Sequence, residues 1–181
     1  MRADAQRNRE NLLAAARHAF TTGDATVALE TIAKDAGVGI GTLYRHFPTR
    51  EALVEAVFRA ERDKLCASAD DLLKTHSPED ALRTWMNHFA DYVTTKRNMA
   101  DALRALIASG AVTSTEAREQ LSTAAAKMLA AGAAAGTLRA DVQAEDVVVS
   151  LVGIFLTSGE PAQRDQADRL LDLLMAGLRT H

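Results

Sequence analysis

Two short apolar patterns separated by a glycine constrain the fold of this chain more than any other feature. In residues 29–36 and again in residues 40–47, apolar side chains recur at spacings of three and four, which is typical of short amphipathic helices. Gly37 stands between them, where a helix commonly ends on a residue in the left-handed conformation. The pattern predicts two brief helices joined by a glycine turn.

This arrangement meets the requirements of a helix-turn-helix. Two closely crossing helices need a small residue at the crossing, here Ala33, and a glycine at the turn, here Gly37. The inner faces must be apolar, and the candidate residues are Ile32, Ala36, Val38 and Leu43. An ordinary hairpin of two helices satisfies the same spacing, so the pattern alone leaves DNA binding as one of two interpretations.

The rest of the chain continues the helical periodicity. Further helices are predicted over residues 7–20, 49–74, 77–93, 99–108, 113–135, 145–158 and 163–179. The chain has 181 residues, 48% of them hydrophobic and only 4% aromatic, with three prolines, a composition that favours helix over strand. We therefore expect an all-α fold of about nine helices, with a helix-turn-helix domain in residues 1–50 and a larger helical domain in residues 51–181.

The charge is unevenly distributed along the chain. The net charge is -3, yet residues 1–50 carry seven Lys or Arg against five Asp or Glu. The remaining residues carry fourteen basic against nineteen acidic side chains. A basic N-terminal quarter on an acidic body is what a small DNA-contacting module requires.

Several functional classes find no support in the sequence. Cys66 is the single cysteine, the N-terminus lacks a secretory signal, and no apolar stretch is long enough to span a bilayer, so we expect a cytoplasmic location and no membrane partner. His76 and His88 lack a recognisable metal-ligand spacing. Because phosphate-binding loops and nucleophile elbows are also absent, we expect neither an enzyme nor a cofactor.

The residues around the glycine turn, 32–58, read IAKDAGVGIGTLYRHFPTREALVEAVF. This stretch resembles the DNA-binding signature of the TetR family of one-component transcriptional regulators. The resemblance is strongest over residues 7–60. Beyond them the chain resembles the family mainly in helix layout and in the turn of residues 136–141. The resemblance implies a homodimer that binds a palindromic operator on double-stranded DNA, most often as a repressor, and that a small-molecule inducer releases.

The resemblance also implies which residues meet DNA. The family's contact positions correspond to Gly41, Thr42, Tyr44 and His46, of which Tyr44 and His46 usually touch phosphates, and Arg50 stands where the family commonly has a phosphate-contacting lysine. Independently of the family, Arg45 is our candidate for base readout, because a guanidinium can make a bidentate contact with guanine. Contact with phosphate or solvent is the alternative for Arg45.

The sequence departs from the family pattern before both short helices. No serine or threonine directly precedes residue 29, although Thr26 is near, and Gly39 and Ile40 replace a frequent serine and a frequent polar or basic residue. These changes suggest fewer phosphate contacts from the two helices. The N-terminal arginines that would then carry more weight, or simply be solvated, are Arg2, Arg7 and Arg9.

The resemblance places an inducer pocket among the middle helices. The candidate lining residues are Trp85, Met86, Phe89, Tyr92, Met99, Leu103, Met128 and Phe155. Bulky apolar side chains at helical spacing are also what a plain core requires, so each of them has that alternative.

The last two predicted helices are candidates for a dimer seam. The predicted helix of residues 145–158 is apolar on nearly every side. Such a helix must be covered by other helices on two opposite sides. The expected interface residues are Val148, Leu151, Val152, Phe155, Leu170, Leu171 and Leu174. Two other interpretations stay open: a regulator of this architecture without an inducer, and a helical dimeric module that binds a ligand or protein but not an operator.

Overall fold

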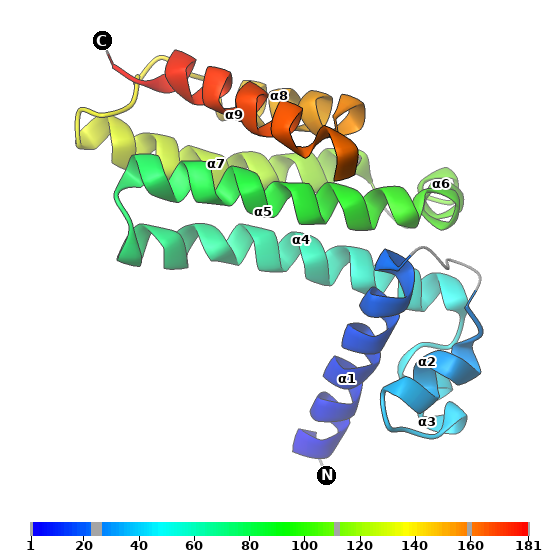
Figure 1. Cartoon of the computed structure of the whole chain (residues 1–181). Coiled ribbons are helices and arrows are strands. Elements are labelled where there is room, and N and C mark those ends of the chain that lie inside the picture. Colours follow the sequence, from blue (N-terminus) through cyan, green and yellow to red (C-terminus); the bar gives the residue numbers. More distant parts are fainter. Residues whose placement is uncertain (1, 23–26, 111–112, 159–160, 181) are drawn as a thin grey trace. The chain divides into compact units, whose positions relative to one another are not determined.

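The protein is all-α, as predicted, in a computed structural model that describes residues 2–22, 27–110, 113–158 and 161–180. The helices labelled in Figure 1 are α1 (Arg2–Thr21), α2 (Leu29–Asp35), α3 (Ile40–His46), α4 (Arg50–Thr75), α5 (Pro78–Asn98), α6 (Ala100–Ala108), α7 (Ser114–Ala134), α8 (Ala144–Thr157) and α9 (Arg164–Leu178). A 3-10 turn, Pro161–Gln163, precedes α9. Within the described ranges, β pairing is limited to one isolated bridge between Leu138 and Arg179.

Two helices are longer than the periodicity predicted. α1 begins at Arg2 rather than at Arg7, and α5 continues to Asn98 rather than ending near Val93. The added first turn of α1 is exposed wherever its side chains are described, so it contributes no apolar signal to the sequence pattern. The other predicted bounds agree with the structure to within about two residues, the usual uncertainty of helix ends.

Side-chain caps fix the starts of α4 and α5. Thr49 Oγ1 accepts a hydrogen bond from the backbone N–H of Ala52 at 3.1 Å, at the start of α4. Ser77 Oγ accepts one from the N–H of Asp80 at 3.2 Å and donates to the Asp80 carboxylate at 2.7 Å, at the start of α5. Each cap satisfies an N–H group that has no partner within the helix, so both predicted helix starts are confirmed.

The described chain divides by its internal contacts into two compact units. The first, called the head unit here, comprises residues 1–61 and 94–113; the second, the body unit, comprises residues 62–93 and 114–181. The division cuts α4 between Glu61 and Arg62 and assigns α6 to the head unit, whereas we expected a boundary near residue 50. The functional division at residue 50 stays a prediction.

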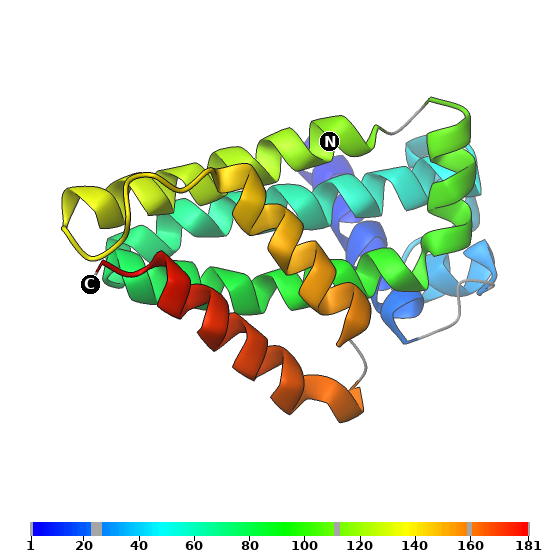
Figure 2. The ribbon, with the colours of Figure 1, turned by 90° about the horizontal axis from the view of Figure 1, so that it is seen from above.

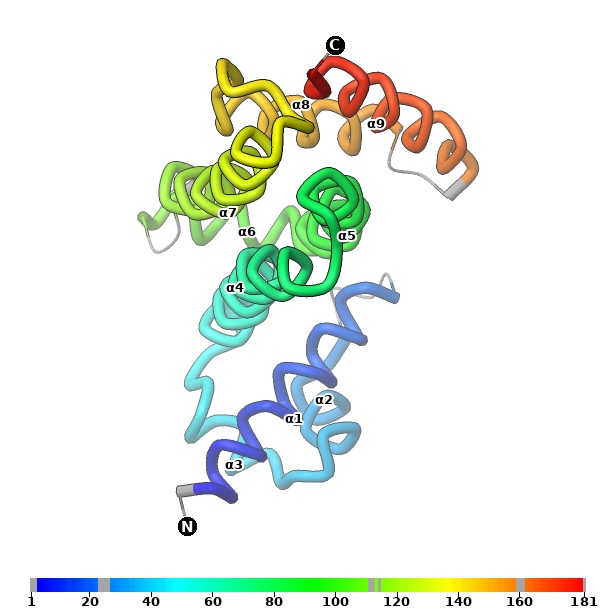
Figure 3. The backbone as a smooth tube through the Cα atoms, turned by 90° about the vertical axis from the view of Figure 1, so that its left-hand side faces the viewer, coloured from blue at the N-terminus to red at the C-terminus, as the bar shows by residue number. Residues whose placement is uncertain are grey.

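The head unit packs α1, α2 and α3 against one another, as Figure 3 shows. Its interior is built from buried apolar side chains, among them Leu12, Ala16, Phe20, Ile32, Leu43, Phe47 and Leu53. Because each of the two short helices is held by this shared core, their stability comes from packing rather than from their own length.

The body unit is a layered helical packing in which α8 contacts both α7 and α9. Figure 2 shows α8 and α9 side by side when seen from above. Gly136, at a φ of +73°, ends α7, and the following residues return to pair with the chain's end through the bridge between Leu138 and Arg179. Gly132 permits this return, because a Cβ there would lie 2.4 Å from Leu138 Cδ1.

None of the helices, as far as the structure describes them, combines the length and the apolar character that crossing a membrane would require.

Candidate nucleic-acid interface and buried core

The helix-turn-helix has the packing that its sequence predicted. Ile32, Ala33 and Leu43 are buried, and the N–H of Val38 donates to the Ala33 carbonyl at 3.0 Å. Gly37 has a φ of +70°, the left-handed conformation expected at this turn. The buried faces of α2 and α3 therefore lock together, and the opposite face of α3 is left for solvent or a partner.

The outer face of α3 carries the predicted DNA-contacting side chains. Tyr44 is 46% exposed, and Arg45 and Gly41 are also exposed, while Thr42 and His46 are half-buried. Gly41 and Arg45 are four residues apart, so they lie one above the other on the face opposite the buried Leu43. In the described part of the chain, no hydrogen bond or ion pair engages the Arg45 guanidinium. This group is free to contact a partner.

Arg50 has a different environment from the one expected. Its Nη1 donates to the backbone carbonyl of Val27 at 2.7 Å, and its guanidinium lies 5.8 Å from the centre of the Phe20 ring. The side chain thus joins the start of α4 to the segment before α2 and to the core of the head. The predicted phosphate contact of Arg50 stays a prediction, and its structural role was not foreseen.

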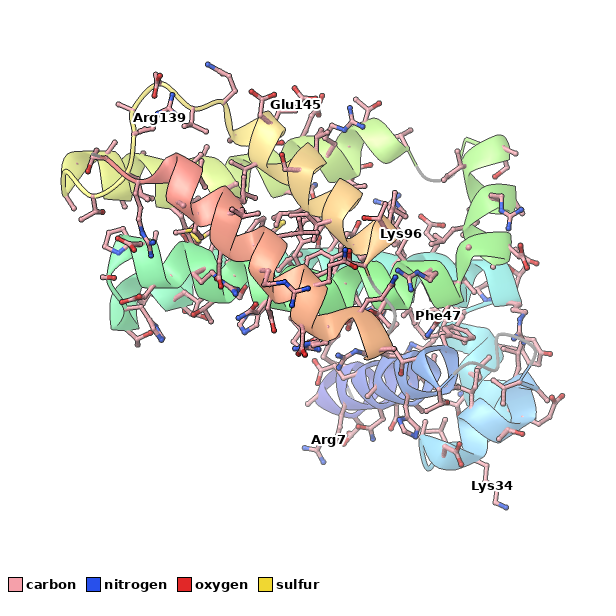
Figure 4. All side chains as sticks on the ribbon, turned by 45° about the horizontal axis from the view of Figure 1, so that its top comes forward. Arg7, Lys34, Phe47, Lys96, Arg139 and Glu145 are labelled. Atoms are coloured by element: carbon pink, nitrogen blue, oxygen red, sulfur yellow. The ribbon has the colours of Figure 1, made fainter. Side chains whose placement is uncertain are left out.

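The departures from the family pattern are visible at the starts of α2 and α3. Their N-cap residues, Ala28 and Gly39, make no side-chain capping bond. Arg7 on α1 and Lys34 on α2 are exposed, and in Figure 4 both side chains point away from the head. Arg9 lies over the Phe47 ring, 5.5 Å from its centre. Thr26 and the side chain of Arg2 lie outside the described residues.

The predicted pocket residues of the body unit are buried, and three of them lie around the ring of Phe89. The Phe89 ring centre is 5.6 Å from those of Trp85 and Tyr92, both edge-on, and 6.3 Å from that of Phe155, which is stacked. Trp85 Nε1 donates to the Leu65 carbonyl of α4 at 2.9 Å. Met86 and Met128 are buried in the same unit. The four rings thus form one aromatic cluster in the core of the body unit.

Two of the predicted pocket residues belong to the other unit. Met99 and Leu103 are buried, but their helical segment is part of the head unit. There the Asn98 side-chain amide donates to the Thr21 carbonyl at the end of α1, at 3.0 Å. Whether any of the eight residues touches a ligand stays a prediction.

One charged side chain beside this core was missed by sequence reasoning. Arg62 of α4 is 4% exposed, and among the described residues it is the only charged one that is buried. Its Nε and Nη2 donate to a single oxygen of Asp63 at 3.0 and 2.9 Å, and Nη1 contacts Glu116 of α7 at 3.4 Å. Its charge also acts on Tyr92, whose hydroxyl pKa is raised by burial and lowered in part by Arg62.

The predicted interface residues divide between the interior and the surface. Val148, Leu151, Phe155 and Leu171 are each at most 5% exposed within one chain, so their side chains pack inward. Their place in a dimer interface stays a prediction, because a helix that is apolar all round does not reveal from its sequence which face is internal. The partly exposed members are Val152, Leu170 and Leu174.

The exposed apolar side chains beside them were not predicted as interface residues. Val149 and Leu156 on α8 are 48% and 65% exposed, and Leu173 on α9 is 68% exposed. A groove of about 500 Å³ on α9 includes Leu170 and Leu173 in its lining. Each of the two helices thus leaves apolar side chains exposed to solvent within one chain.

Comparison with models of known families shows which family the chain belongs to. A model of the TetR family of bacterial regulatory proteins matches residues 12–57, and a model of the C-terminal domain of SbtR-like transcriptional regulators matches residues 77–180. The second match alone covers more than half of the chain. The chain belongs to the TetR family of transcriptional regulators.

Solved structures and curated relatives agree with this assignment. A TetR transcriptional regulator from Streptomyces coelicolor is 49% identical with a TM-score of 0.86, covering 94% of this chain and 98% of that one. A TetR regulatory protein from Mycobacterium vanbaalenii is 32% identical with a TM-score of 0.79, covering 99% of each chain. The transcriptional regulator UidR of Escherichia coli is 30% identical over 94 residues, which are 51% of this chain and 42% of UidR. The chain thus spans less than half of that curated relative.

The match to the TetR family places the protein among DNA-binding transcriptional regulators, and the matched residues 12–57 contain its helix-turn-helix. The positions implied by the family resemblance, Gly41, Thr42, Tyr44 and His46, all lie on α3, and Arg45 joins them on its exposed face. Arg50 stands apart at the start of α4. The motif located the helix correctly, while the individual contacts to DNA stay predictions.

Proposed function

We propose that this TetR-family regulator is a repressor that binds a palindromic operator as a homodimer and is released by a small-molecule inducer. The observation that carries the proposal is the outer face of α3, where Tyr44 and Arg45 are exposed and Arg45 has no partner in the described chain. A helix of this size fits the major groove, and its apolar opposite face anchors it to the head.

The contacts divide by chemistry. Tyr44 and His46 would hydrogen-bond phosphate oxygens and fix the register, and Arg45 would contact guanine O6 and N7, which is worth about 1–3 kcal/mol of discrimination between bases. The exposed Arg7 and Lys34 would add sequence-independent attraction to the backbone. Arg50 would act chiefly by holding the head together, because its guanidinium already donates to Val27.

The dimer would form through the exposed apolar surface of α8 and α9. Val149, Val152 and Leu156 follow one another at spacings of three and four, and Leu170, Leu173 and Leu174 form the matching row on α9. Two copies related by a two-fold axis would bury both rows in a self-complementary interface. Such a dimer presents two heads, which is what a palindromic site with half-sites about 34–36 Å apart requires.

The aromatic core of the body unit would hold the inducer. Phe89 and the three rings around it offer a large apolar surface, and Trp85 ties that surface to α4 through the Leu65 carbonyl. Because α4 begins beside α3 and continues into the body unit, a ligand that prefers one position of α4 would shift the population of head spacings. The repressor would then lose its match to the operator.

The test is the selection of bound duplexes from a random DNA pool, sequenced after repeated rounds and repeated at two salt concentrations. An enriched palindrome whose binding weakens steeply with salt is expected, because phosphate contacts release counterions. A folded dimer that enriches no sequence would contradict the operator function. It would instead support a ligand- or protein-binding module, the alternative favoured by the absence of side-chain caps at Ala28 and Gly39.

A further inference from the structure

The guanidinium of Arg62 is buried without a full set of acceptors. Arginine has five N–H groups, and three hydrogen bonds engage Arg62 in the described chain. Two of them converge on one oxygen of Asp63, the next residue on the same helix, and the third is a long contact of 3.4 Å to Glu116. A carboxylate that met the fork with both of its oxygens would be bound better than either of these.

The two carboxylates that hold Arg62 face solvent. The side chain of Asp63 is 63% exposed and that of Glu116 is 42% exposed, whereas the side chain of Arg62 is 5% exposed. Either carboxylate can be rehydrated at little cost if it leaves, but the guanidinium cannot. Arg62 is therefore the fixed member of the cluster, and its partners are the ones that an anion can replace.

Arg62 lies at the edge of the aromatic core. Burial raises the pKa of the Tyr92 hydroxyl and the nearby Arg62 charge lowers it in part, while the Tyr92 ring centre lies 5.6 Å from that of Phe89. One turn beyond Arg62 on α4, the Leu65 carbonyl accepts the bond from Trp85. A single molecule with an apolar body and one anionic end would match this combination of rings and guanidinium.

We propose that Arg62 binds the carboxylate of an apolar, preferably aromatic, organic acid, and that this acid displaces Glu116 from Nη1. The inference rests on the proposed function, because it names the ligand class of the same sensing core. It also identifies the contact that ligand binding breaks. Arg62 and Glu116 join α4 to α7, so the acid would exchange a bond between helices for a bond to itself.

The experiment measures binding of matched acids and amides to the full-length dimer by calorimetry. The probes are 1-naphthoate and phenylacetate, each compared with its primary amide, which has the same shape without the charge. We expect the acids to bind at least about 10-fold more tightly than the amides. In Arg62→Met, which keeps the apolar stem, this preference should disappear.

Lys127→Met is the matched control. Lys127 Nζ contacts both oxygens of Asp70 at 2.9 Å, so it also joins α7 to α4 by an ion pair, but at the surface. If Arg62 only ties the helices together, the two variants should change acid binding alike. The proposal predicts that Lys127→Met keeps the preference for acids.

The Glu116→Gln variant distinguishes competition between Glu116 and the acid for Arg62 from a purely structural role of Glu116. With the competing charge removed, the acids should bind several-fold more tightly and the amides should be unchanged. Equal binding of acids and amides to the wild type, no binding of either acid, or acid binding that survives Arg62→Met would overturn the inference. Operator binding without ligand is measured in parallel, so a protein that binds its operator yet ignores these acids refutes the ligand class alone.

Discussion

The outer face of α3 and the interior around Arg62 use the same chemical group in opposite ways. Arg45 is exposed and has no partner in the described chain, whereas Arg62 is 4% exposed and is held by two carboxylates. A guanidinium that contacts DNA can remain hydrated until it binds, because DNA is large and supplies the negative charge of its phosphates. One that senses a small molecule must be fixed beforehand, and its fixation becomes part of the fold's stability.

This comparison predicts that substitutions in the buried core of the body unit affect the stability of the fold more than any other property. Phe89→Ala removes a side chain that is 0% exposed and contacts three rings, so we expect a loss of about 3–5 kcal/mol in the free energy of unfolding. Urea denaturation measures it. His88→Ala, on the exposed neighbouring position, is the control and should change stability little. A loss below about 1 kcal/mol for Phe89→Ala would show that the core collapses around the gap.

An exposed apolar residue should behave differently from a buried one. Leu173→Glu places charge on a side chain that is 68% exposed, so one chain should keep its fold while the proposed dimer separates. Losing the second head should weaken operator binding by about 10²–10⁴-fold. Sedimentation and operator titration measure the two effects. Asp165→Lys, also exposed on α9, is the control, and a variant that remains dimeric would remove Leu173 from the seam.

The α3 face should change recognition and leave stability intact. Arg45→Met should cost about 1–3 kcal/mol on the selected operator and much less on random duplex, with an unchanged melting temperature. Lys34→Met removes an exposed charge from α2 and should weaken binding equally on all sequences. If Arg45→Met gives the same uniform loss, Arg45 contacts phosphate rather than a base.

The smallest expected effect lies where α4 begins. Thr49→Ala removes the oxygen that accepts the Ala52 N–H, so the free energy of unfolding should fall by about 1 kcal/mol. Thr49→Ser keeps the oxygen and should restore most of the loss. Thermal unfolding of the two variants checks this, and equal melting temperatures would mean that water replaces the cap.

The head could be predicted because its determinants are local. Gly37 and Thr49 act within a few residues of themselves, and each has the conformation or the bond that its type and position predicted. Local rules also predict which face of α3 is internal, since the apolar Leu43 is buried. They do not identify the role of Arg50, which depends on Val27 and Phe20 from separate segments.

The packing of the body unit could not be predicted from the sequence, because it depends on residues that are far apart along the chain. Arg62 stands in the run Glu61, Arg62, Asp63, Lys64, which has the composition of a solvated helix face. Its burial follows from the packing of the body unit, where its ion-pair partner Glu116 lies on α7. Along α8, Val148 and Val149 are indistinguishable by type, yet one is 2% and the other 48% exposed. Only the packing of neighbouring helices separates an internal valine from a surface one.

The bond from Arg50 to Val27 affects how mutants of this regulator would be interpreted. A genetic screen for operator-defective alleles would recover changes at residue 50, and its proximity to α3 would suggest a lost phosphate contact. The guanidinium, however, also joins two segments of the head across the Phe20 ring. Arg50→Lys would keep the charge but lose the planar fork, and a mutant that fails to bind its operator could simply hold α3 at the wrong angle.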